Sequence, residues 1–324
     1  MSTSSEPLRF GVLGCASVAW RRMMPALRGS PDARLVAVAG REEARTRRFA
    51  ETFGCDPVHG YPRLLERPDV DAVYVALPTG LHAEWATRAM EAGKHVLVEK
   101  PMATSPDEAR DLVAAARAHG VRLMENRMFV HHPQHRSVQD LVEGGAVGEV
   151  RVFTSGMAIP PLPADDIRYR PDLGGGALLD VGFYPVHAAL LFLGPSLEVA
   201  GAVLRHDART GVDVGGDVLL RSADGVAAHL TFGFEHAYRS WYELWGDRGR
   251  IVLERAFTPP PDREPVVEIV RDSRRETVRL GPSDQFRRIV ERFAAVVRGE
   301  ADGAGHLETT VRGLALLESI RKNT

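Results

Sequence analysis

The stretch LRFGVLGCASVAW, residues 8–20, decides the fold, because an apolar segment runs directly into a loop of small residues. Leu8 to Leu13 is predicted to be a buried strand, and Val18 to Leu27 a helix. Gly14 to Ala19 forms a G-x-A-x-x-A variant of the dinucleotide-binding fingerprint, in which small residues let a pyrophosphate approach the helix N-terminus. A tight turn without a ligand is the alternative. The fingerprint predicts cofactor contacts from Gly14, Ala16, Ser17 and Val18.

The arrangement of strand and helix then repeats. Further strands are predicted at Arg34 to Ala39, Ala72 to Leu77 and His95 to Val98, with helix-like segments between them. One of these helices, Pro106 to His119, has Ser105 as its N-cap and is closed by a glycine. Such alternation predicts parallel βαβ units, so residues 1–123 are expected to form a Rossmann domain.

Beyond Gly148 the pattern changes to alternating strand-like segments, with a helix-like stretch at Ala177 to Phe192. The segments are Glu198 to Arg205, Asp217 to Arg221, Val226 to Phe234, Ser240 to Trp245 and Ile251 to Leu253. We therefore predict an α/β chain whose N-terminal Rossmann domain has a parallel sheet. Residues 124–324 are expected to form a substrate-binding α+β domain with a large open, mostly antiparallel sheet. An exposed sheet face favours self-association, so a homodimer or homotetramer through this sheet is predicted.

Composition excludes several classes of protein. The 324 residues exceed what one core usually organises, which favours two domains. With 44% hydrophobic and 26% charged residues and a net charge of −2, neither disorder nor nucleic-acid binding is expected. The polar start, Met1 to Pro7, and the lack of an apolar run of about 18 residues predict a cytoplasmic protein without a membrane partner. Cys15 and Cys55, the two cysteines, rule out a disulfide framework.

The end of the second predicted strand, Ala39-Gly40-Arg41, bears on the type of dinucleotide. An NAD-selective site places a carboxylate there for the ribose 2′-hydroxyl, and a 2′-phosphate repels that carboxylate. Here a glycine precedes an arginine, whose planar fork suits a phosphate. Gly40 and Arg41 therefore predict NADP(H) as the cofactor. In the alternative, Arg41 only begins a solvated helix, and Glu42 is the carboxylate most able to overturn the prediction.

Lysine is scarce, since only Lys94, Lys100 and Lys322 occur among 41 basic residues, so a retained lysine is a candidate for chemistry. Lys100 belongs to one of three motifs through which nearly the whole chain resembles the glucose-fructose oxidoreductase, inositol dehydrogenase and rhizopine-catabolism (Gfo/Idh/MocA) family. The motifs are Ala76 to Thr79 with His82, Gly93 to Pro101, and Gly174 to Tyr184. The resemblance implies that Lys100 lies between nicotinamide and substrate. It also implies a nicotinamide site lined by Leu77, Pro78, Thr79, His82 and Glu99.

Two residues are predicted to carry the chemistry. Hydride delivery to a carbonyl leaves alkoxide charge, which needs a nearby cation or hydrogen-bond donor and finally a proton. Many dehydrogenases of this family have histidine where this chain has Tyr184. Tyrosine, with an ordinary pKa of about 10, becomes a better acid beside a lysine ammonium. We predict Tyr184 as the proton donor and Lys100 as its electrostatic partner, with a merely packed Tyr184 as the alternative.

Other polar residues are given supporting roles. Asp180 is predicted to orient the helix of Tyr184 or a substrate hydroxyl, and Arg168 to bind substrate, together with Arg170 if a phosphate must be held. His187 is expected to pack one turn beyond Tyr184. The histidines at 131, 132 and 135 are not predicted to bind metal, because Pro133 interrupts their spacing.

The segment Glu125 to His135, with Lys100 and Tyr184, looks most like the sugar 3-ketoreductases of deoxysugar biosynthesis. The resemblance implies an NADPH-dependent oxidoreductase acting on CH-OH/C=O groups. Its expected substrate is a nucleotide-linked sugar, a dTDP-3,4-diketo-2,6-dideoxyhexose reduced at the C3 keto group. One alternative is an NAD(P)-dependent dehydrogenase of a free sugar, an inositol or a trans-dihydrodiol. Others are a non-catalytic cofactor-binding regulator and a nicotinamide-dependent glycosidase.

Overall fold

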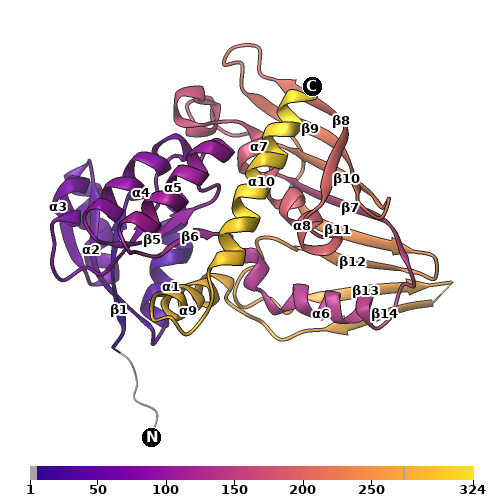
Figure 1. Cartoon of the computed structure of the whole chain (residues 1–324), viewed down its shortest axis with the longest axis horizontal. Helices are drawn as coiled ribbons and strands as arrows, with labels where there is room; N and C mark the ends of the chain where they lie inside the picture. The colour runs from indigo at the N-terminus through magenta and orange to yellow at the C-terminus, as the bar shows by residue number, and fades with distance from the viewer. Residues whose placement is uncertain (1–5, 273) are drawn as a thin grey trace, which may run out of the picture. The chain divides into compact units, whose positions relative to one another are not determined.

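The computed structural model describes residues 6–272 and 274–324, in which the chain forms two compact units (Figure 1). The first unit extends to Met128 and takes in Phe286–Thr310, and the second comprises Phe129–Gln285 and Val311–Thr324. Helix α9 (Gln285–Val297) packs Phe293 against Phe10 of the first unit, with ring centroids 5.9 Å apart. The units are therefore not divided at one point of the chain, unlike the predicted domains 1–123 and 124–324.

The first unit is built on a six-stranded parallel sheet in the order β3-β2-β1-β4-β5-β6, which confirms the predicted Rossmann sheet. The strand order reverses at β1, and dinucleotides bind Rossmann sheets at such a switch point. Its strands are β1 (Leu8–Leu13), β2 (Ala33–Gly40), β3 (Asp56–His59), β4 (Ala72–Val75), β5 (His95–Glu99) and β6 (Leu123–Asn126). Its helices include α1 (Met24–Gly29), α2 (Glu43–Phe53), α3 (Tyr61–Leu65), α4 (His82–Glu91) and α5 (Pro106–Ala118).

The sequence pattern misses two strands of this sheet, β3 and β6. In β3, an edge strand that contains Pro57, only Val58 is buried. Edge strands tolerate proline and need little apolar surface, so β3 gives no strand signal. In β6, Glu125 and Asn126 are polar although both are 0% exposed. Polar residues at the buried end of a strand hide it from a pattern search, and here they mark the edge of the sheet where ligands bind.

The second unit contains an eight-stranded sheet in the order β14-β13-β12-β11-β7-β10-β9-β8. Neighbouring strands are antiparallel except β7 and β10, which confirms the predicted mostly antiparallel sheet. The first four strands along the chain are β7 (Val150–Ala158), β8 (Leu197–His206), β9 (Asp213–Ser222) and β10 (Ala227–Gly233). They are followed by β11 (Arg239–Gly246), β12 (Arg250–Glu254), β13 (Val266–Arg271) and β14 (Arg274–Arg279).

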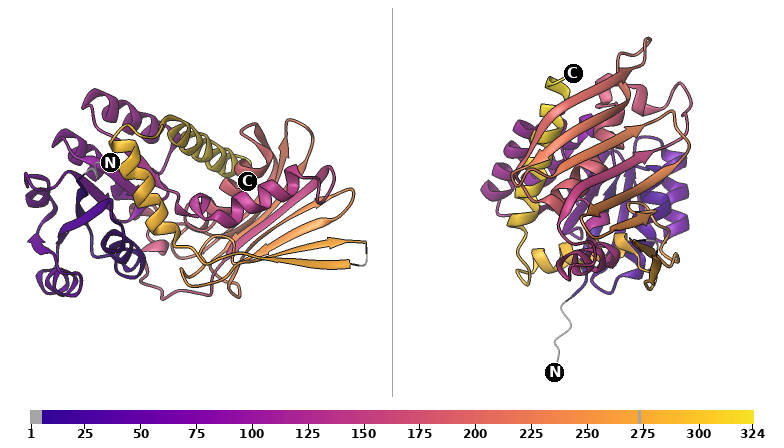
Figure 2. Two further views of the ribbon diagram at one scale, coloured as in Figure 1. Left: turned by 90° about the horizontal axis from the view of Figure 1, so that it is seen from below. Right: turned by 90° about the vertical axis from the view of Figure 1, so that its right-hand side faces the viewer.

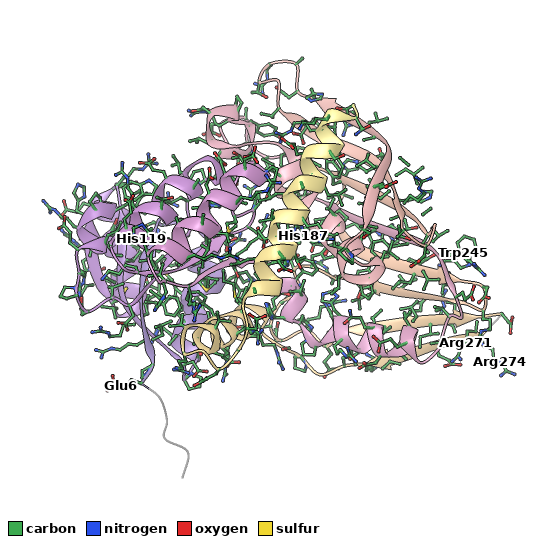
Figure 3. All side chains as sticks on the ribbon, viewed as in Figure 1. Glu6, His119, His187, Trp245, Arg271 and Arg274 are labelled. Carbon is green, nitrogen blue, oxygen red and sulfur yellow. The ribbon has the colours of Figure 1, made fainter. Side chains whose placement is uncertain are left out.

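The two faces of this sheet differ. Along β11, buried Tyr242 and Leu244 alternate with Trp241 and Trp245, of which Trp245 is 57% exposed (Figure 3). Helices α6 (Pro133–Glu143) and α8 (Phe183–Leu193) lie on the buried face (Figure 2). Helix α10 (Ala304–Lys322) belongs to the second unit from Val311 onward.

The helix predicted over Ala177 to Phe192 is two helices, α7 (Ala177–Asp180) and α8. The segments Pro171–Asp180 and Phe183–Leu193 bend by 46° at the break between them. In the part of the chain that the structure describes, no single helix has the length and apolar composition to cross a bilayer. These two segments meet that criterion only when taken together.

Candidate active site

The glycine-rich loop of the first unit follows β1. Gly14 has a φ of +101°, and a Cβ there would overlap the carbonyl oxygen of Ala76. Both the backbone conformation and the space therefore require glycine. Helical residues begin at Ser17, directly after this loop, and the amide groups of a first helical turn lack partners within the helix. This cradle fits the pyrophosphate of a dinucleotide.

The end of β2 lies beside the glycine-rich loop. Arg41 is exposed, and its charge acts on the nearby side chain of Tyr61. Burial raises the pKa of Tyr61, and the Arg41 charge opposes this shift. A Cβ at Gly40 would overlap Oγ1 of Thr46, so the position before Arg41 has no room for a side chain. An exposed guanidinium without a neighbouring carboxylate at position 40 fits a phosphorylated ribose.

His82 connects two loops of the first unit. Its Nδ1 lies 2.8 Å from the carbonyl oxygen of Pro101, and its Nε2 lies 2.8 Å from that of Leu77. The side chain is 1% exposed, and burial lowers the pKa of His82. Because backbone carbonyls engage both ring nitrogens, His82 holds the Leu77–Thr79 turn against the loop after β5. Direct contact of His82 with a cofactor stays a prediction.

Glu99, at the end of β5, is the centre of a buried hydrogen-bond network. Its Oε1 accepts hydrogen bonds from the Tyr74 hydroxyl and the side-chain amide of Asn126. Its Oε2 accepts one from the Lys100 amide at 3.1 Å. Burial raises the pKa of Glu99, and these donors oppose the shift. The three side chains come from the ends of β4, β5 and β6, so the network fixes the strand end that carries Lys100.

The two lysines of the first unit have different surroundings. Lys94 is 9% exposed, and its Nζ donates to the carbonyl oxygens of Arg67 at 2.7 Å and Val70 at 2.8 Å. Burial lowers the pKa of Lys94. Lys94 is thus a structural cation. Lys100 is partly exposed at the carboxyl edge of the sheet, and its peptide bond to Pro101 is cis.

A second buried carboxylate, Glu125, lies on the neighbouring strand β6. Its Oε1 accepts a hydrogen bond from the Met102 amide at 2.9 Å, and its Oε2 accepts one from the Thr310 hydroxyl at 3.1 Å. Arg127 pairs with it at 3.4 Å, but burial still raises the pKa of Glu125. Sequence reasoning gave Glu125 no role. The signal was the polar run Glu125-Asn126-Arg127 directly after apolar residues.

Tyr184 lies in an aromatic cluster of the second unit and is 5% exposed. Its ring stacks on Phe257 with centroids 5.4 Å apart and an interplanar angle of 23°. It meets the ring of Phe129 edge to face at 5.9 Å. Phe257 and Phe129 also contact each other at 5.3 Å. Packing on these rings therefore fixes the plane of the Tyr184 phenol.

Asp180 and Arg168 form an ion pair in the same unit. The Arg168 Nε donates to the Asp180 Oδ2 at 2.5 Å, and its Nη1 lies 3.2 Å from an Asp166 oxygen. Asp180 raises the pKa of Arg168 further above its ordinary value. The two side chains remain 38% and 26% exposed, so a polar ligand can still reach them. Arg170 pairs separately with Asp172.

His187 and His135 have protein partners. The Nδ1 atom of His187, which is labelled in Figure 3, lies 2.9 Å from the Phe183 carbonyl. The His187 ring stacks on that of Phe183 with centroids 3.9 Å apart. His135 Nδ1 lies 3.0 Å from the Tyr242 hydroxyl. Among residues 6–272 and 274–324, no group of three or more His, Cys, Asp or Glu could hold a metal ion.

The structure thus divides the predicted site residues between the units. The first unit contains the glycine-rich loop, Arg41, His82, Glu99 and Lys100, together with Leu77, Pro78 and Thr79. The second unit contains Arg168, Asp180 and Tyr184. Sequence reasoning gave no role to Thr46, Tyr74 and Glu125.

Comparisons with known proteins find relatives that match nearly the whole chain. A dTDP-3,4-didehydro-2,6-dideoxy-alpha-D-glucose 3-reductase from Actinomadura kijaniata is 51% identical over 318 residues, covering 98% of this chain and 96% of the relative. A reductase of the same name from Saccharopolyspora spinosa is 50% identical, covering 97% of each. KijD10, a 3-ketoreductase from Actinomadura kijaniata solved with NADP and TDP-benzene, has a TM-score of 0.96 at 51% identity, covering 98% of each chain.

Variants of KijD10 have also been solved with TDP-benzene and NADP, one with a tyrosine changed to phenylalanine and one with a lysine changed to alanine. Both positions have numbers two higher than Tyr184 and Lys100 here.

Family comparisons cover most of the chain. Residues 8–127 match the oxidoreductase family with NAD-binding Rossmann fold, and residues 135–252 match the GFO/IDH/MocA C-terminal domain. The chain therefore belongs to the Gfo/Idh/MocA family of oxidoreductases.

Proposed function

We propose that this protein is an NADPH-dependent ketoreductase that reduces the C3 keto group of a dTDP-3,4-diketo-2,6-dideoxyhexose. The observation that carries the proposal is 51% identity, over 98% of the chain, with a reductase named for that substrate. The similarity extends through both units, so it includes the cofactor loops and the helix of Tyr184.

The first unit supplies the proposed cofactor contacts. Gly14, with Ala16, Ser17 and Val18, holds the pyrophosphate, and Arg41 beside Gly40 binds the 2′-phosphate. The Leu77–Thr79 turn and Glu99 line the nicotinamide half, with His82 fixing the turn. When bound, NADPH supplies the hydride that reduces the substrate carbonyl.

Lys100 and Tyr184 are proposed to act on the same carbonyl oxygen. The Lys100 ammonium stabilises the negative charge that develops there, and the Tyr184 hydroxyl gives up its proton to form the alcohol. The Glu99 network holds the Lys100 backbone, and the Phe257 ring holds the phenol. The existence of tyrosine and lysine variants of KijD10 supports this choice of residues.

The second unit is proposed to recognise the sugar nucleotide. Arg168 and Asp180 keep exposed polar atoms within their ion pair, which suits hydroxyl or phosphate oxygens of the substrate. A dTDP group would then supply binding energy remote from the reacting carbon. Free sugars, which lack that group, should react poorly.

A steady-state assay tests the function. NADPH oxidation would be followed with a dTDP-3,4-diketo-2,6-dideoxyhexose generated in situ, and with free sugars, inositols and dihydrodiols as comparators. The sugar nucleotide should have the highest kcat/KM, and dTDP should inhibit. A higher kcat/KM for a free sugar or diol would support the dehydrogenase alternative, and no turnover of any of them would support the regulator.

Assembly and location complete the proposal. Val203, Leu219 and Trp245 of the large sheet are 66%, 40% and 57% exposed, and a second copy of the chain is proposed to cover this face as a homodimer or homotetramer. NADPH and a nucleotide sugar are cytoplasmic metabolites, so the enzyme is placed in the cytoplasm. Light scattering of the wild type and of Trp245→Glu would test the assembly, since the charge should weaken association.

A further inference from the structure

Gly40, the last residue of β2, is required by space and not by backbone conformation. It lies within a strand and is not among the glycines with positive φ. A Cβ built there would overlap Oγ1 of Thr46 and lie 3.0 Å from Sγ of Cys15. The end of β2 therefore has no room for a side chain while Thr46 keeps its position.

Thr46 is fixed in that position. It is 1% exposed on α2, and its Oγ1 donates a hydrogen bond to the Glu42 carbonyl at 2.8 Å. The Cys15 thiol also lies within hydrogen-bond reach of the same oxygen, at 3.8 Å. Threonine in a helix has few χ1 rotamers, and a rotation that clears Gly40 would break the bond to Glu42 inside the core. Thr46 thus joins the glycine-rich loop, the end of β2 and the start of α2.

We propose that Thr46 is a specificity-determining residue for the cofactor. A site selective for NAD needs a carboxylate at the end of the second strand, and the Thr46 hydroxyl occupies the space which the first atom of that side chain needs. Selectivity for NADP(H) therefore depends on Gly40 and Thr46 as a pair, in addition to the charge of Arg41. This inference rests on the proposed NADPH dependence.

The same distances show which substitution would remove the overlap between Thr46 and a side chain at position 40. Replacing Thr46 by alanine deletes Oγ1 and leaves its Cβ 3.4 Å from a Cβ at position 40, which is ordinary contact. The Cys15 sulfur is the end of a small side chain and can turn away from 3.0 Å. Thr46→Ala should therefore make room for an aspartate at position 40.

Four variants test the inference: Gly40→Asp, Thr46→Ala, Gly40→Asp/Thr46→Ala and Gly40→Asp/Thr46→Val. Valine keeps the branched shape of threonine without its hydroxyl, so the last variant is the matched control for the steric block. Thermal unfolding measures Tm. Calorimetry with adenosine 2′,5′-bisphosphate and with 5′-AMP measures recognition of the ribose without turnover, and NADPH and NADH kinetics follow.

The expected pattern is specific. Gly40→Asp alone should lower Tm and weaken both nucleotides, and Thr46→Ala alone should keep the preference for the 2′-phosphate. Gly40→Asp/Thr46→Ala should recover Tm and shift the ratio of affinities toward 5′-AMP by at least about tenfold relative to Gly40→Asp. The valine control should resemble Gly40→Asp.

Two outcomes would overturn the inference. One is a Gly40→Asp variant that is as stable as the wild type and already prefers 5′-AMP. The other is a Gly40→Asp/Thr46→Ala variant whose Tm and relative affinity for 5′-AMP are no higher than those of Gly40→Asp. A wild type that binds 5′-AMP more tightly would instead contradict the proposed NADPH dependence. Whichever cofactor is preferred, the Tm of Gly40→Asp/Thr46→Ala compared with that of Gly40→Asp tests whether Thr46 excludes a side chain at position 40.

Discussion

Lys100 and Tyr184 are held in place by different kinds of contact. Lys100 follows a strand end fixed by a buried carboxylate with three hydrogen-bond donors, from Tyr74, Asn126 and its own amide. Tyr184 lies in a cluster of rings, where stacking on Phe257 sets its plane. Hydrogen bonds to a buried charge depend on protonation, whereas ring packing depends on volume. We therefore expect the position of Lys100 to respond to pH and to changes of charge, and the position of Tyr184 to respond to changes of side-chain volume.

The largest expected effect comes from removing the two residues themselves. Lys100→Ala and Tyr184→Phe should each lower kcat by about 10²-fold or more and leave NADPH affinity largely intact, as expected for a charge stabiliser and a proton donor. Stopped-flow turnover and fluorescence titration of NADPH measure the two quantities.

The double variant sharpens the comparison. If both side chains act on one carbonyl oxygen, the fold-loss in kcat of Lys100→Ala/Tyr184→Phe should be smaller than the product of the fold-losses of the two single variants. Near-normal turnover of Tyr184→Phe would remove tyrosine as the proton donor, and His187 would be the next candidate.

The positive charge of Arg41 should also favour NADPH over NADH. Arg41→Ala should raise the KM for NADPH by roughly tenfold or more and leave that for NADH nearly unchanged, because only NADPH carries the 2′-phosphate. Arg47→Ala is a matched control, since Arg47 is exposed on α2 and pairs with Glu43. Equal losses with both cofactors would count against a phosphate role for Arg41.

The aromatic support of Tyr184 should be sensitive to shape. Phe257→Leu keeps an apolar side chain but removes the ring that stacks on Tyr184, so kcat should fall while the KM for NADPH stays constant. Stability should fall by about 1 kcal/mol, measured by urea unfolding. Unchanged kcat in a destabilised variant would show that stacking does not orient the phenol.

The smallest expected effect is a pH slope from Glu99. Burial raises the pKa of Glu99 above its ordinary value of 4.5, so the folded protein holds this proton more tightly than the unfolded chain. Its contribution to stability is complete below pH 4.5 and is lost as the pH rises through the raised pKa. Glu99→Gln, which does not titrate, should become more stable relative to the wild type across that range. Urea unfolding at several pH values measures the free energy of unfolding of both proteins. If the values for wild type and Glu99→Gln change in parallel with pH, the prediction is wrong.

Most of the fold and the main chemical motifs could be predicted from local pattern. Apolar runs and the fingerprint at Gly14 are signals contained within a few residues, and both sheets, the family and the oxidoreductase class are confirmed. The division of α7 from α8 was not predicted, although Gly182 and Pro185 within the mostly apolar run from Ala177 to Phe192 are residues that can interrupt a helix.

The supporting residues could not be predicted, because their roles depend on contacts between distant segments. In the sequence, Tyr74 is indistinguishable from the apolar residues of its strand. Only the pairing of β4 with β5 brings its hydroxyl to Glu99. Thr46 reads as a helix residue, and only the fold places it against Gly40. Glu125 meets Thr310 across 185 positions of sequence. The predicted roles of Arg168 and Asp180 did not include their pairing with each other.

The burial of Lys94 gives the protein a built-in chemical reporter. Amine-selective reagents such as acylating esters need an accessible neutral amine, and Lys94 is enclosed with its Nζ bonded to two carbonyl oxygens. Of the three lysines, Lys100 and Lys322 are then the accessible ones, and Lys322 pairs with Glu318 at the end of the last helix. Peptide mapping of the acylated protein by mass spectrometry can therefore compare modification at Lys100 with modification at Lys322. Protection by added nucleotide would show how closely a ligand approaches that amine, without mutating a single residue.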